Sequence, residues 1–347
     1  MVSPDQIISL CGILEGVSRV AVVCHSHPDG DAVGSAGALA SYLAARCGKD
    51  ALAILPDDAS DALSFISGPL VLNASRKPAE AAAFIGSCDL LVCVDMNAFD
   101  RAGALEPLLA SCGARKLLID HHLNPDRGNF DLVFSEIGIS SASELVFWIL
   151  SMMPGEDGGK SLPADVAMSL MTGMTTDTNN FANSVFPSTL RMASILLEAG
   201  VDRDAIISNL YNGYRENRVR AMGFFLSELL HITPDGVACM VLTDEVRKRF
   251  DLREGETEGF VNIPLSIDRV RMSLLLKEDD GFFRVSIRSK KGVSANRLAK
   301  QCFNGGGHEL AAGGKLFFPG DIASRDEAEV YVENVTARFL RETAPGK

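Results

Sequence analysis

Two imidazoles follow a carboxylate at residues 120–122, where the sequence reads Asp-His-His. The apolar residues 117–119 precede them and predict a short buried strand. Open α/β sheets place their ligands at the carboxyl ends of parallel strands, so Asp120, His121 and His122 are expected at that edge. Imidazole and carboxylate together suit Mn²⁺, Zn²⁺ or Fe²⁺. The motif therefore predicts a metal site, provided that other strands carry matching groups to the same edge.

Further side chains of the same kind follow other predicted elements. They are His25, Asp29 and Asp31 after a strand at 19–24, Asp95 after a strand at 89–94, and Asp177 after a helix at 164–174. Parallel strands bring such residues to one edge although they are far apart in the sequence. With His121 they make two imidazoles and four carboxylates, and the carboxylates would repel one another around a single ion. We therefore expect a site for two divalent cations.

Each of these residues also has a purely structural explanation. An Asp between a strand and a helix commonly caps the helix, Asp29 with Gly30 is a common turn pair, and an isolated His is often a hydrogen-bonded structural residue. Four loops with such residues at one edge are harder to explain by capping alone. The combination favours the metal site.

The surrounding pattern predicts an α/β fold for the first part of the chain. Strands are expected at 19–24, 51–55, 89–94 and 116–119, alternating with helices at 5–16, 32–46 and 78–85. This alternation is typical of a doubly wound, mostly parallel sheet. From 141 to 231 the pattern is largely helical, and it ends in a long helix at 215–230.

A smaller α+β domain is expected after the turn at 233–236. Its strands are predicted at 237–242, 270–276, 282–288 and 315–318, and its helices at 294–303 and 326–341. We therefore expect a first domain at 1–210, a connecting helix at 211–234 and a second domain at 235–347.

Composition narrows the class of protein. The chain has 347 residues and a net charge of −12, and the whole deficit lies in the first 234 residues, with 15 basic and 27 acidic side chains. This charge argues against indiscriminate nucleic-acid binding and fits a module that binds cations. The eight cysteines form no C-x-x-C pair and are expected as reduced core residues. Without a signal-peptide pattern or an apolar run of about 18 residues, we expect a cytoplasmic protein with no membrane segment.

A basic stretch and three consecutive glycines stand out in the second domain. Between 284 and 300 there are six basic residues and no acidic one, namely Arg284, Arg288, Lys290, Lys291, Arg297 and Lys300. Gly305, Gly306, Gly307 and His308 follow. A solvated face and a helix end would explain these features singly, but one glycine suffices to end a helix. Consecutive glycines can form an anion-binding nest, so we predict that this segment, with Arg288 and His308, receives a terminal phosphate.

Aromatic residues are too few to suggest a long nucleic-acid groove. The chain has one Trp and four Tyr, whereas proteins that bind long single strands usually offer several stacking side chains. Substrates of a few nucleotides, or a nucleoside bisphosphate, fit better.

Four segments resemble the motifs of the DHH phosphoesterases, and the match covers nearly the whole chain. They are residues 22–35, Val94-Asp95, Asp120-His121-His122 and residues 172–178. The stretch 304–313 resembles the glycine-rich motif of the DHH-associated C-terminal domain. With this motif the chain resembles the nanoRNase and pAp phosphatase branch of the family rather than the manganese pyrophosphatases. His27, where this branch commonly has Asn, and Asn179, where Gly is usual, depart from the pattern. His27 thereby remains an alternative ligand.

The resemblance implies roles for the individual residues. One ion would be held by His25, Asp29 and Asp95, and the other by Asp31, Asp95, His121 and Asp177, with Asp95 bridging. The expected cations are two Mn²⁺, with Mg²⁺ as the alternative. His122 would act on the substrate, and Asp120 would orient His121 or His122. Arg101, at a commonly basic position of the branch, would contact phosphate, although an ordinary surface arginine is the alternative.

The same resemblance implies hydrolysis of short oligoribonucleotides and of 3′-phosphoadenosine 5′-phosphate (pAp) to nucleoside monophosphates by water activated between two metals. Linear or cyclic diadenylate is an alternative substrate, and polyphosphate ranks lower. A non-catalytic nucleotide-binding regulatory module is the non-enzymatic alternative, against which the complete set of ligand positions counts. The sequence leaves open the physiological ion, the preferred nucleotide and whether the chain forms a homodimer.

Overall fold

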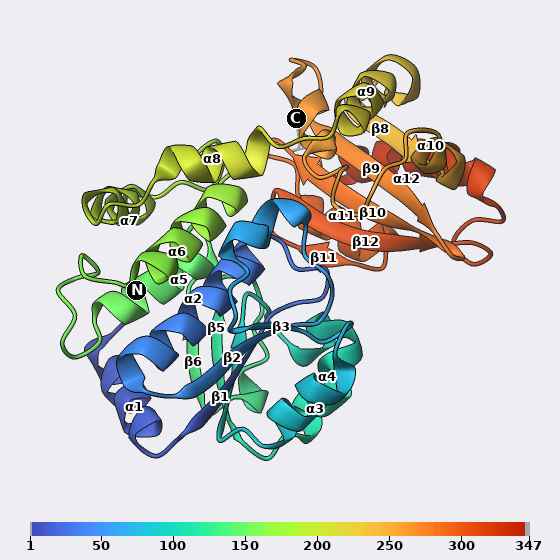
Figure 1. Ribbon diagram of the computed structural model, residues 1–347. Helices are drawn as coiled ribbons and strands as arrows, with labels where there is room; N and C mark the ends of the chain where they lie inside the picture. Colours follow the sequence, from blue (N-terminus) through green and yellow to red (C-terminus); the bar gives the residue numbers. More distant parts are fainter. Residues whose placement is uncertain (1, 344–347) are drawn as a thin grey trace. The chain divides into compact units, whose positions relative to one another are not determined.

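The computed structural model describes residues 2–343 (Figure 1). The chain divides into two compact units, the first ending at Gly213 and the second beginning at Tyr214. Residues 214–234, most of the segment expected as a connecting helix, group with the second unit. Among the described residues, none of the helices combines the length and the apolar character that a bilayer crossing requires.

The first unit alternates strands with helices. Its strands are β1 Arg19–Val23, β2 Asp50–Leu55, β3 Val71–Asn73, β4 Leu90–Val94, β5 Arg115–Asp120 and β6 Leu132–Ser135. Its α-helices are α1 Pro4–Glu15, α2 Gly30–Cys47, α3 Pro78–Gly86, α4 Glu106–Ser111, α5 Ala142–Ser151, α6 Ala164–Asp177, α7 Pro187–Glu198 and α8 Arg203–Tyr211. Short 3₁₀ helices lie at η1 Asp61–Ile66, η2 Phe99–Leu105 and η3 Arg127–Asn129.

The strands of the first unit form one parallel sheet in the order β3-β2-β1-β4-β5-β6. The expected doubly wound α/β fold is thereby confirmed. The strand order reverses between β1 and β4, which makes the crevice beyond their carboxyl ends the usual ligand position of such a sheet. The edge strands β3 and β6 were not predicted, because three and four residues are too few to show a periodic pattern.

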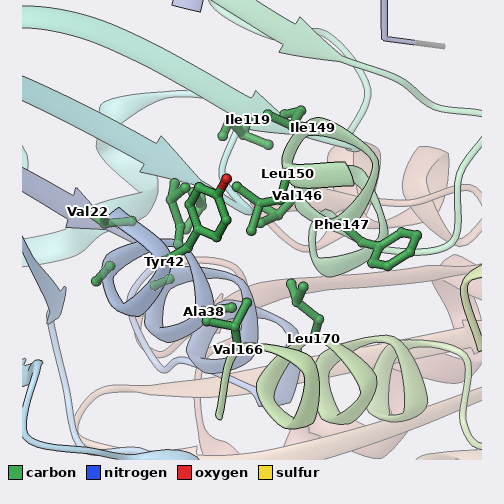
Figure 2. Packing of buried hydrophobic residues seen from close by; sticks show 14 of the residues in the cluster. Val22, Ala38, Tyr42, Ile119, Val146, Phe147, Ile149, Leu150, Val166 and Leu170 are labelled. Carbon is green, nitrogen blue, oxygen red and sulfur yellow. The ribbon is translucent and has the colours of Figure 1, made fainter. Parts of the chain in front are cut away.

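Alternate residues of the central strands pack into two cores. On β1, Val20 and Val22 face the core shared with α2, α5 and α6, whereas Ala21 and Val23 face the core on the α3 and α4 side. Figure 2 shows the first of these cores, with Val22 and Ile119 of the sheet beside Tyr42 of α2. Both faces of the sheet are therefore covered, as a buried parallel sheet requires.

Small residues let α2 and α6 approach closely. A Cβ on Gly34 of α2 would lie 2.6 Å from the carbonyl oxygen of Ser169 in α6. A Cβ on Gly173 of α6 would overlap the Ser143 hydroxyl of α5. This close packing fixes the start of α2 and the end of α6 relative to each other, and each of those ends carries a predicted metal ligand.

The second unit is built around a mixed sheet. Its strands are β7 His231–Ile232, β8 Val237–Leu242, β9 Met272–Asp279, β10 Phe282–Ser289, β11 Gly306–Gly307 and β12 Ala311–Phe317. Its helices are α9 Glu216–Phe224, η4 Phe225–Leu229, α10 Asp244–Arg249, η5 Phe260–Ser266, α11 Ala295–Cys302, η6 Arg325–Glu327 and α12 Ala328–Thr343. The strand order is β11-β12-β10-β9-β8-β7, with only the β8–β9 pair parallel among the strands described.

Alternation along β9 again separates two cores. Leu274 and Leu276 pack in the core that contains α11 and α12, and Leu275 packs with Phe225 and Phe260 on the other face. The helix expected at 215–230 is regular only over α9 and continues as the π-helical turn η4. The unit is the α+β fold that the sequence predicted.

Candidate metal centre

Asp95 is the centre of a buried cluster at the carboxyl edge of the first sheet. Its Oδ2 lies 3.4 Å from Nε2 of His25, and its Oδ1 lies 3.3 Å from Nε2 of His121. Oδ1 is buried and accepts no hydrogen bond from any described residue. The backbone of Asp95 has φ 55°, a left-handed conformation that Asp tolerates better than most residues. Its N–H donates to the Ile119 carbonyl, which holds this strained position against β5.

Three groups of side chains share Asp95, and within each group the candidate ligand atoms lie within 4.8 Å of one another. Two of them carry predicted metal ligands, His25 with Asp29 and Asp31 with His121, and the third consists of Asp95, Asp120 and His122. Asp177 joins the second group, because its Oδ2 is 3.6 Å from Nε2 of His121. The structure thus brings together all six side chains that the sequence singled out as metal ligands.

Hydrogen bonds orient the side chains of the first group. Nδ1 of His25 lies 2.8 Å from the carbonyl oxygen of Ser26, and an N–H at this position turns Nε2 toward Asp95. Such second contacts commonly fix the tautomer of a metal-binding histidine. Asp29 caps α2, since its Oδ1 accepts the N–H groups of Asp31 and Ala32. The capping explanation therefore holds for Asp29, but the same oxygen also lies 3.9 Å from Nε2 of His25.

Asp31 is anchored by the start of α5. Its Oδ2 accepts the N–H of Ala142 at 2.6 Å and its Oδ1 accepts the N–H of Ser143 at 2.9 Å. The first N–H groups of a helix attract a carboxylate, because they have no partner within the helix and lie at its positive end. These contacts were not predicted, since a backbone N–H has no signature in the sequence.

Asp120 orients His122. Its Oδ1 accepts the Nδ1–H of the His122 ring at 2.7 Å, and its Oδ2 accepts the backbone N–H of His122 at 3.1 Å. The sequence left open whether Asp120 holds His121 or His122, and the structure shows the contact with His122. Nδ1 of His122 also lies 3.7 Å from Oδ1 of Asp95, so this ring borders the cluster.

The close carboxylates shift the pKa values of the cluster. Burial lowers the pKa of His25 and His121, but the adjacent Asp95 and the other carboxylates outweigh burial and raise these pKa values to about 9 and about 10. Burial and neighbouring carboxylates raise the pKa of Asp31, and that of Asp177 to about 6. Burial acts in the same direction on Asp95, yet the two imidazoles lower its pKa below the usual range. In the metal-free cluster, protonated imidazoles thus neutralise part of the carboxylate charge, and divalent cations would neutralise more of it.

His27 and Arg101 lie at the border of this site. The backbone of His27 has φ 53°, its N–H donates to Oδ2 of Asp57 at 2.8 Å, and its exposed ring faces the same carboxylate at 3.9 Å. In the part of the chain that the structure describes, the groups able to share an ion do not include His27. Arg101 is exposed, and its carbonyl accepts the N–H of Ser26 at 2.7 Å, which places it beside the loop that carries His25.

The glycine segment of the second unit forms a short strand. Gly306 and Gly307 pair with β12. The N–H of Gly305 donates to the Ala299 carbonyl and that of His308 to the Ala311 carbonyl. Two of the N–H groups expected in an anion nest are therefore used within the unit. Arg288 of β10 is also paired with Ala311, so the predicted phosphate receptors Arg288 and His308 flank the same residue of β12.

The fold requires glycine at two positions of the triplet but not at the third. A Cβ on Gly305 would overlap the Gly313 carbonyl, and Gly307 has φ 137° with its Cβ position 2.8 Å from the Ala311 carbonyl. At Gly306 a Cβ would meet only Cε of Lys300, at 3.7 Å. The space beside Gly306 is therefore open, with one flexible cation next to it.

The six basic residues of this stretch differ in their surroundings. Three are engaged, Arg284 with Glu254 and Asp279, Lys290 with the carbonyls of Ile267 and Asp268, and Arg297 over the Phe339 ring. Arg288 donates to the Ile287 carbonyl. Lys291 and Lys300 are exposed, and neither has a hydrogen-bond or ion-pair partner within residues 2–343. The basic stretch is therefore not a uniform cationic surface.

Residues 19–174 match the DHH family N-terminal domain, and residues 235–323 match the DHHA1 domain. The chain therefore belongs to the DHH family of phosphoesterases, whose members depend on metal ions. The crystal structure of an exopolyphosphatase-related protein from Bacteroides fragilis is 34% identical and superposes with a TM-score of 0.89, covering 99% of each chain.

Two relatives carry names that state an activity. The bifunctional oligoribonuclease and PAP phosphatase NrnA of Bacillus subtilis is 29% identical over 221 residues, which cover 62% of this chain and 66% of the relative. The probable bifunctional oligoribonuclease and PAP phosphatase NrnA of Streptococcus mutans is 32% identical over 205 residues, which cover 57% and 62%. The chain thus matches slightly less than two thirds of the length of each.

Proposed function

We propose that this chain is a two-metal phosphoesterase that hydrolyses short oligoribonucleotides and pAp to nucleoside monophosphates. The observation that carries the proposal is the convergence of two imidazoles and three further carboxylates on Asp95, whose buried Oδ1 accepts no hydrogen bond from the described residues. Such an oxygen is costly in a folded protein unless it binds something, and a cation is the partner that suits this set of donors. The names of the two curated relatives support the choice of substrate.

The proposed ligands follow the two groups around Asp95. His25, Asp29 and Asp95 hold one cation, and Asp31, Asp95, His121 and Asp177 hold the other. Mn²⁺ is the preferred ion in this proposal and Mg²⁺ the alternative. When bound, two such cations lower the pKa of a water molecule and neutralise phosphoryl oxygens during in-line attack.

The protein's remaining residues position the substrate in this proposal. Asp120 holds the His122 ring by Nδ1 and by the backbone, so that this imidazole keeps one orientation toward the phosphoryl group. Arg101 contacts a phosphate beside the His25 loop. In the second domain, Arg288, the glycines 305–307 and His308 receive a terminal phosphate.

A substrate panel tests this function. Purified protein is assayed with Mn²⁺ and with Mg²⁺ on pApA, pAp, cyclic diadenylate, polyphosphate and bis-p-nitrophenyl phosphate. We expect the highest kcat/KM on pApA or pAp. Polyphosphate is included because of the name of the Bacteroides fragilis relative. A clear preference for polyphosphate or diadenylate would contradict the proposed substrate, and stoichiometric nucleotide binding without turnover would contradict an enzyme.

The His308→Ala variant tests the role of the second domain. A lost charge-assisted contact of about 1.5–3 kcal/mol corresponds to a decrease in kcat/KM of roughly 10- to 150-fold on pApA and pAp. Bis-p-nitrophenyl phosphate has no terminal phosphate for His308 to bind, so its hydrolysis should be unchanged. Equal losses on both kinds of substrate, or a loss of bound metal, would move His308 into the catalytic centre instead.

A further inference from the structure

Two cysteines of the first unit face each other. Sγ of Cys88 lies 3.9 Å from Sγ of Cys112. Cys88 lies between α3 and β4, and Cys112 directly follows α4, whose partner α3 packs on the same face of the sheet (Figure 1). The two sulfurs lie 3.2 Å and 3.5 Å from the carbonyl oxygen of Ile85, to which each S–H can donate. The Ile85 carbonyl, in the last turn of α3, thus contacts both thiols.

The pair differs from the other cysteines of the chain. Cys88 and Cys112 are half-buried, as are Cys11 and Cys47, whereas the remaining four cysteines are buried. For the residues that the structure covers, no other two cysteine sulfurs are in hydrogen-bonding contact. Cys88 and Cys112 also line a surface hollow of about 480 Å³, whose wall includes Gly12, Gly86 and Gly113. The hollow therefore offers a small reagent a place beside two cysteines whose sulfurs already lie close together.

We propose that Cys88 and Cys112 form a covalent modification site, at which a small-molecule disulfide oxidises the two thiols to an intramolecular disulfide. One thiolate attacks the reagent, forming a mixed disulfide and releasing one reagent thiol. The second thiolate then attacks the protein sulfur of that mixed disulfide, and the second reagent thiol leaves. The two protein sulfurs lose two electrons and two protons, and the reagent disulfide gains them as two thiols.

The geometry requires a modest movement. A disulfide has a sulfur–sulfur distance of about 2.05 Å, so two sulfurs that now lie 3.9 Å apart must approach by roughly 1.9 Å. Burial and the adjacent Cys112 raise the pKa of Cys88 to about 12, so this group is a thiol at neutral pH. The exchange is therefore slow, on a scale of about minutes to hours.

The new bond would lie far along the strands from the metal cluster. Cys88 precedes β4 and Cys112 precedes β5, so both are at the amino-terminal edge of the sheet, whereas Asp95 and Asp120 are at its carboxyl edge. The disulfide would close a segment of about 25 residues that contains β4, and closing such a loop restricts the unfolded chain. We therefore expect the oxidised protein to unfold at a temperature roughly 5–10 °C higher, with unchanged turnover.

The test uses the full chain incubated with glutathione disulfide. Thiols are counted after denaturation, peptide mapping locates the bond, and the unfolding temperature is measured before and after reduction with dithiothreitol. Wild type should lose two of its eight thiols. Its unfolding temperature should rise on oxidation and return to the starting value after reduction. Cys88→Ala and Cys112→Ala should form no internal bond. Cys11→Ala, which removes another half-buried cysteine, should behave like wild type.

Three results would overturn the proposal. The first is a bond that forms earlier between other cysteines, and the second is a glutathione adduct on Cys88 or Cys112 that never resolves to a disulfide. The third is an oxidised protein that unfolds at the same or a lower temperature. Circular dichroism of both alanine variants separates these results from a failure to fold, and Cys88→Ser provides a second variant that preserves the size of the side chain.

Discussion

Metal binding should displace protons from the cluster around Asp95. In the metal-free protein the pKa of His25 is about 9 and that of His121 about 10, so both rings carry a proton at pH 7.5. A protonated imidazole nitrogen cannot bind a cation, and each proposed site contains one of these rings. We therefore expect each Mn²⁺ to release about one proton on binding, and the apparent Kd to rise as the pH falls.

The magnitude follows from this exchange. One proton released per ion changes the apparent Kd by about tenfold per pH unit. Lowering the pH from 8.5 to 7.5 should therefore raise the apparent Kd of each ion by close to tenfold. A histidine with the ordinary pKa of about 6.5 would already be about nine-tenths deprotonated at pH 7.5 and would give almost no change. The interval between pH 7.5 and 8.5 thus distinguishes the two cases.

Titration calorimetry provides the measurement. Mn²⁺ is titrated into metal-free protein in two buffers with different enthalpies of ionisation, and the difference in heat gives the number of protons released. We expect about two protons per protein at pH 8 and about one for His25→Gln, which lacks one of the two titrating rings. Release of less than half a proton by the wild type, or equal release by the variant, would refute the reasoning.

Three further predictions concern single residues. Asp95→Asn keeps the size of the side chain but removes its charge, and should abolish hydrolysis of bis-p-nitrophenyl phosphate at saturating Mn²⁺; clear residual turnover would contradict the bridging role. Gly173→Ala places a Cβ against Ser143 and 2.9 Å from Oδ1 of Asp31, and should lower the free energy of unfolding by about 1–3 kcal/mol and weaken metal binding in denaturant and metal titrations. Gly223→Ala, whose Cβ would meet nothing beyond its own turn of helix within 4 Å, should do neither. Lys300→Gln should raise KM for pApA several-fold in steady-state assays while Lys291→Gln leaves it unchanged, and equal effects would show that only net charge matters.

Much of the cluster could be predicted from the sequence, because parallel strands make a simple geometric rule. Residues that follow β1, β4 and β5 must meet at one edge, and so His25, Asp95 and His121 do. Asp177 was expected after a helix, whereas it is the last residue of α6. The residue itself was identified because its type, rather than its position in the helix, suggested a ligand.

Contacts set by tertiary packing could not be predicted. The N–H groups that hold Asp31 are 111 and 112 residues away in the sequence, and hydrophobic periodicity reports only which face of an element is buried. The same limit applies to Cys88 and Cys112, which look like ordinary core residues one at a time. The glycine triplet is a case in which the sequence suggested more than the structure shows. It resembles an anion-binding nest, but part of its backbone pairs with β12.

The anchoring of Asp31 also bears on which ions the cluster can accept. Each oxygen of this carboxylate already accepts one backbone N–H, so a rotation of the group toward an ion would break these two hydrogen bonds. Asp29 is restrained in a similar way, because its Oδ1 accepts two N–H groups. Ca²⁺ favours six to eight oxygen ligands with adaptable, often bidentate carboxylates, whereas smaller ions accept fixed one-oxygen ligands in compact octahedra. We therefore expect the backbone N–H groups at the starts of α2 and α5, by restraining these two carboxylates, to disfavour Ca²⁺ in the proposed cluster.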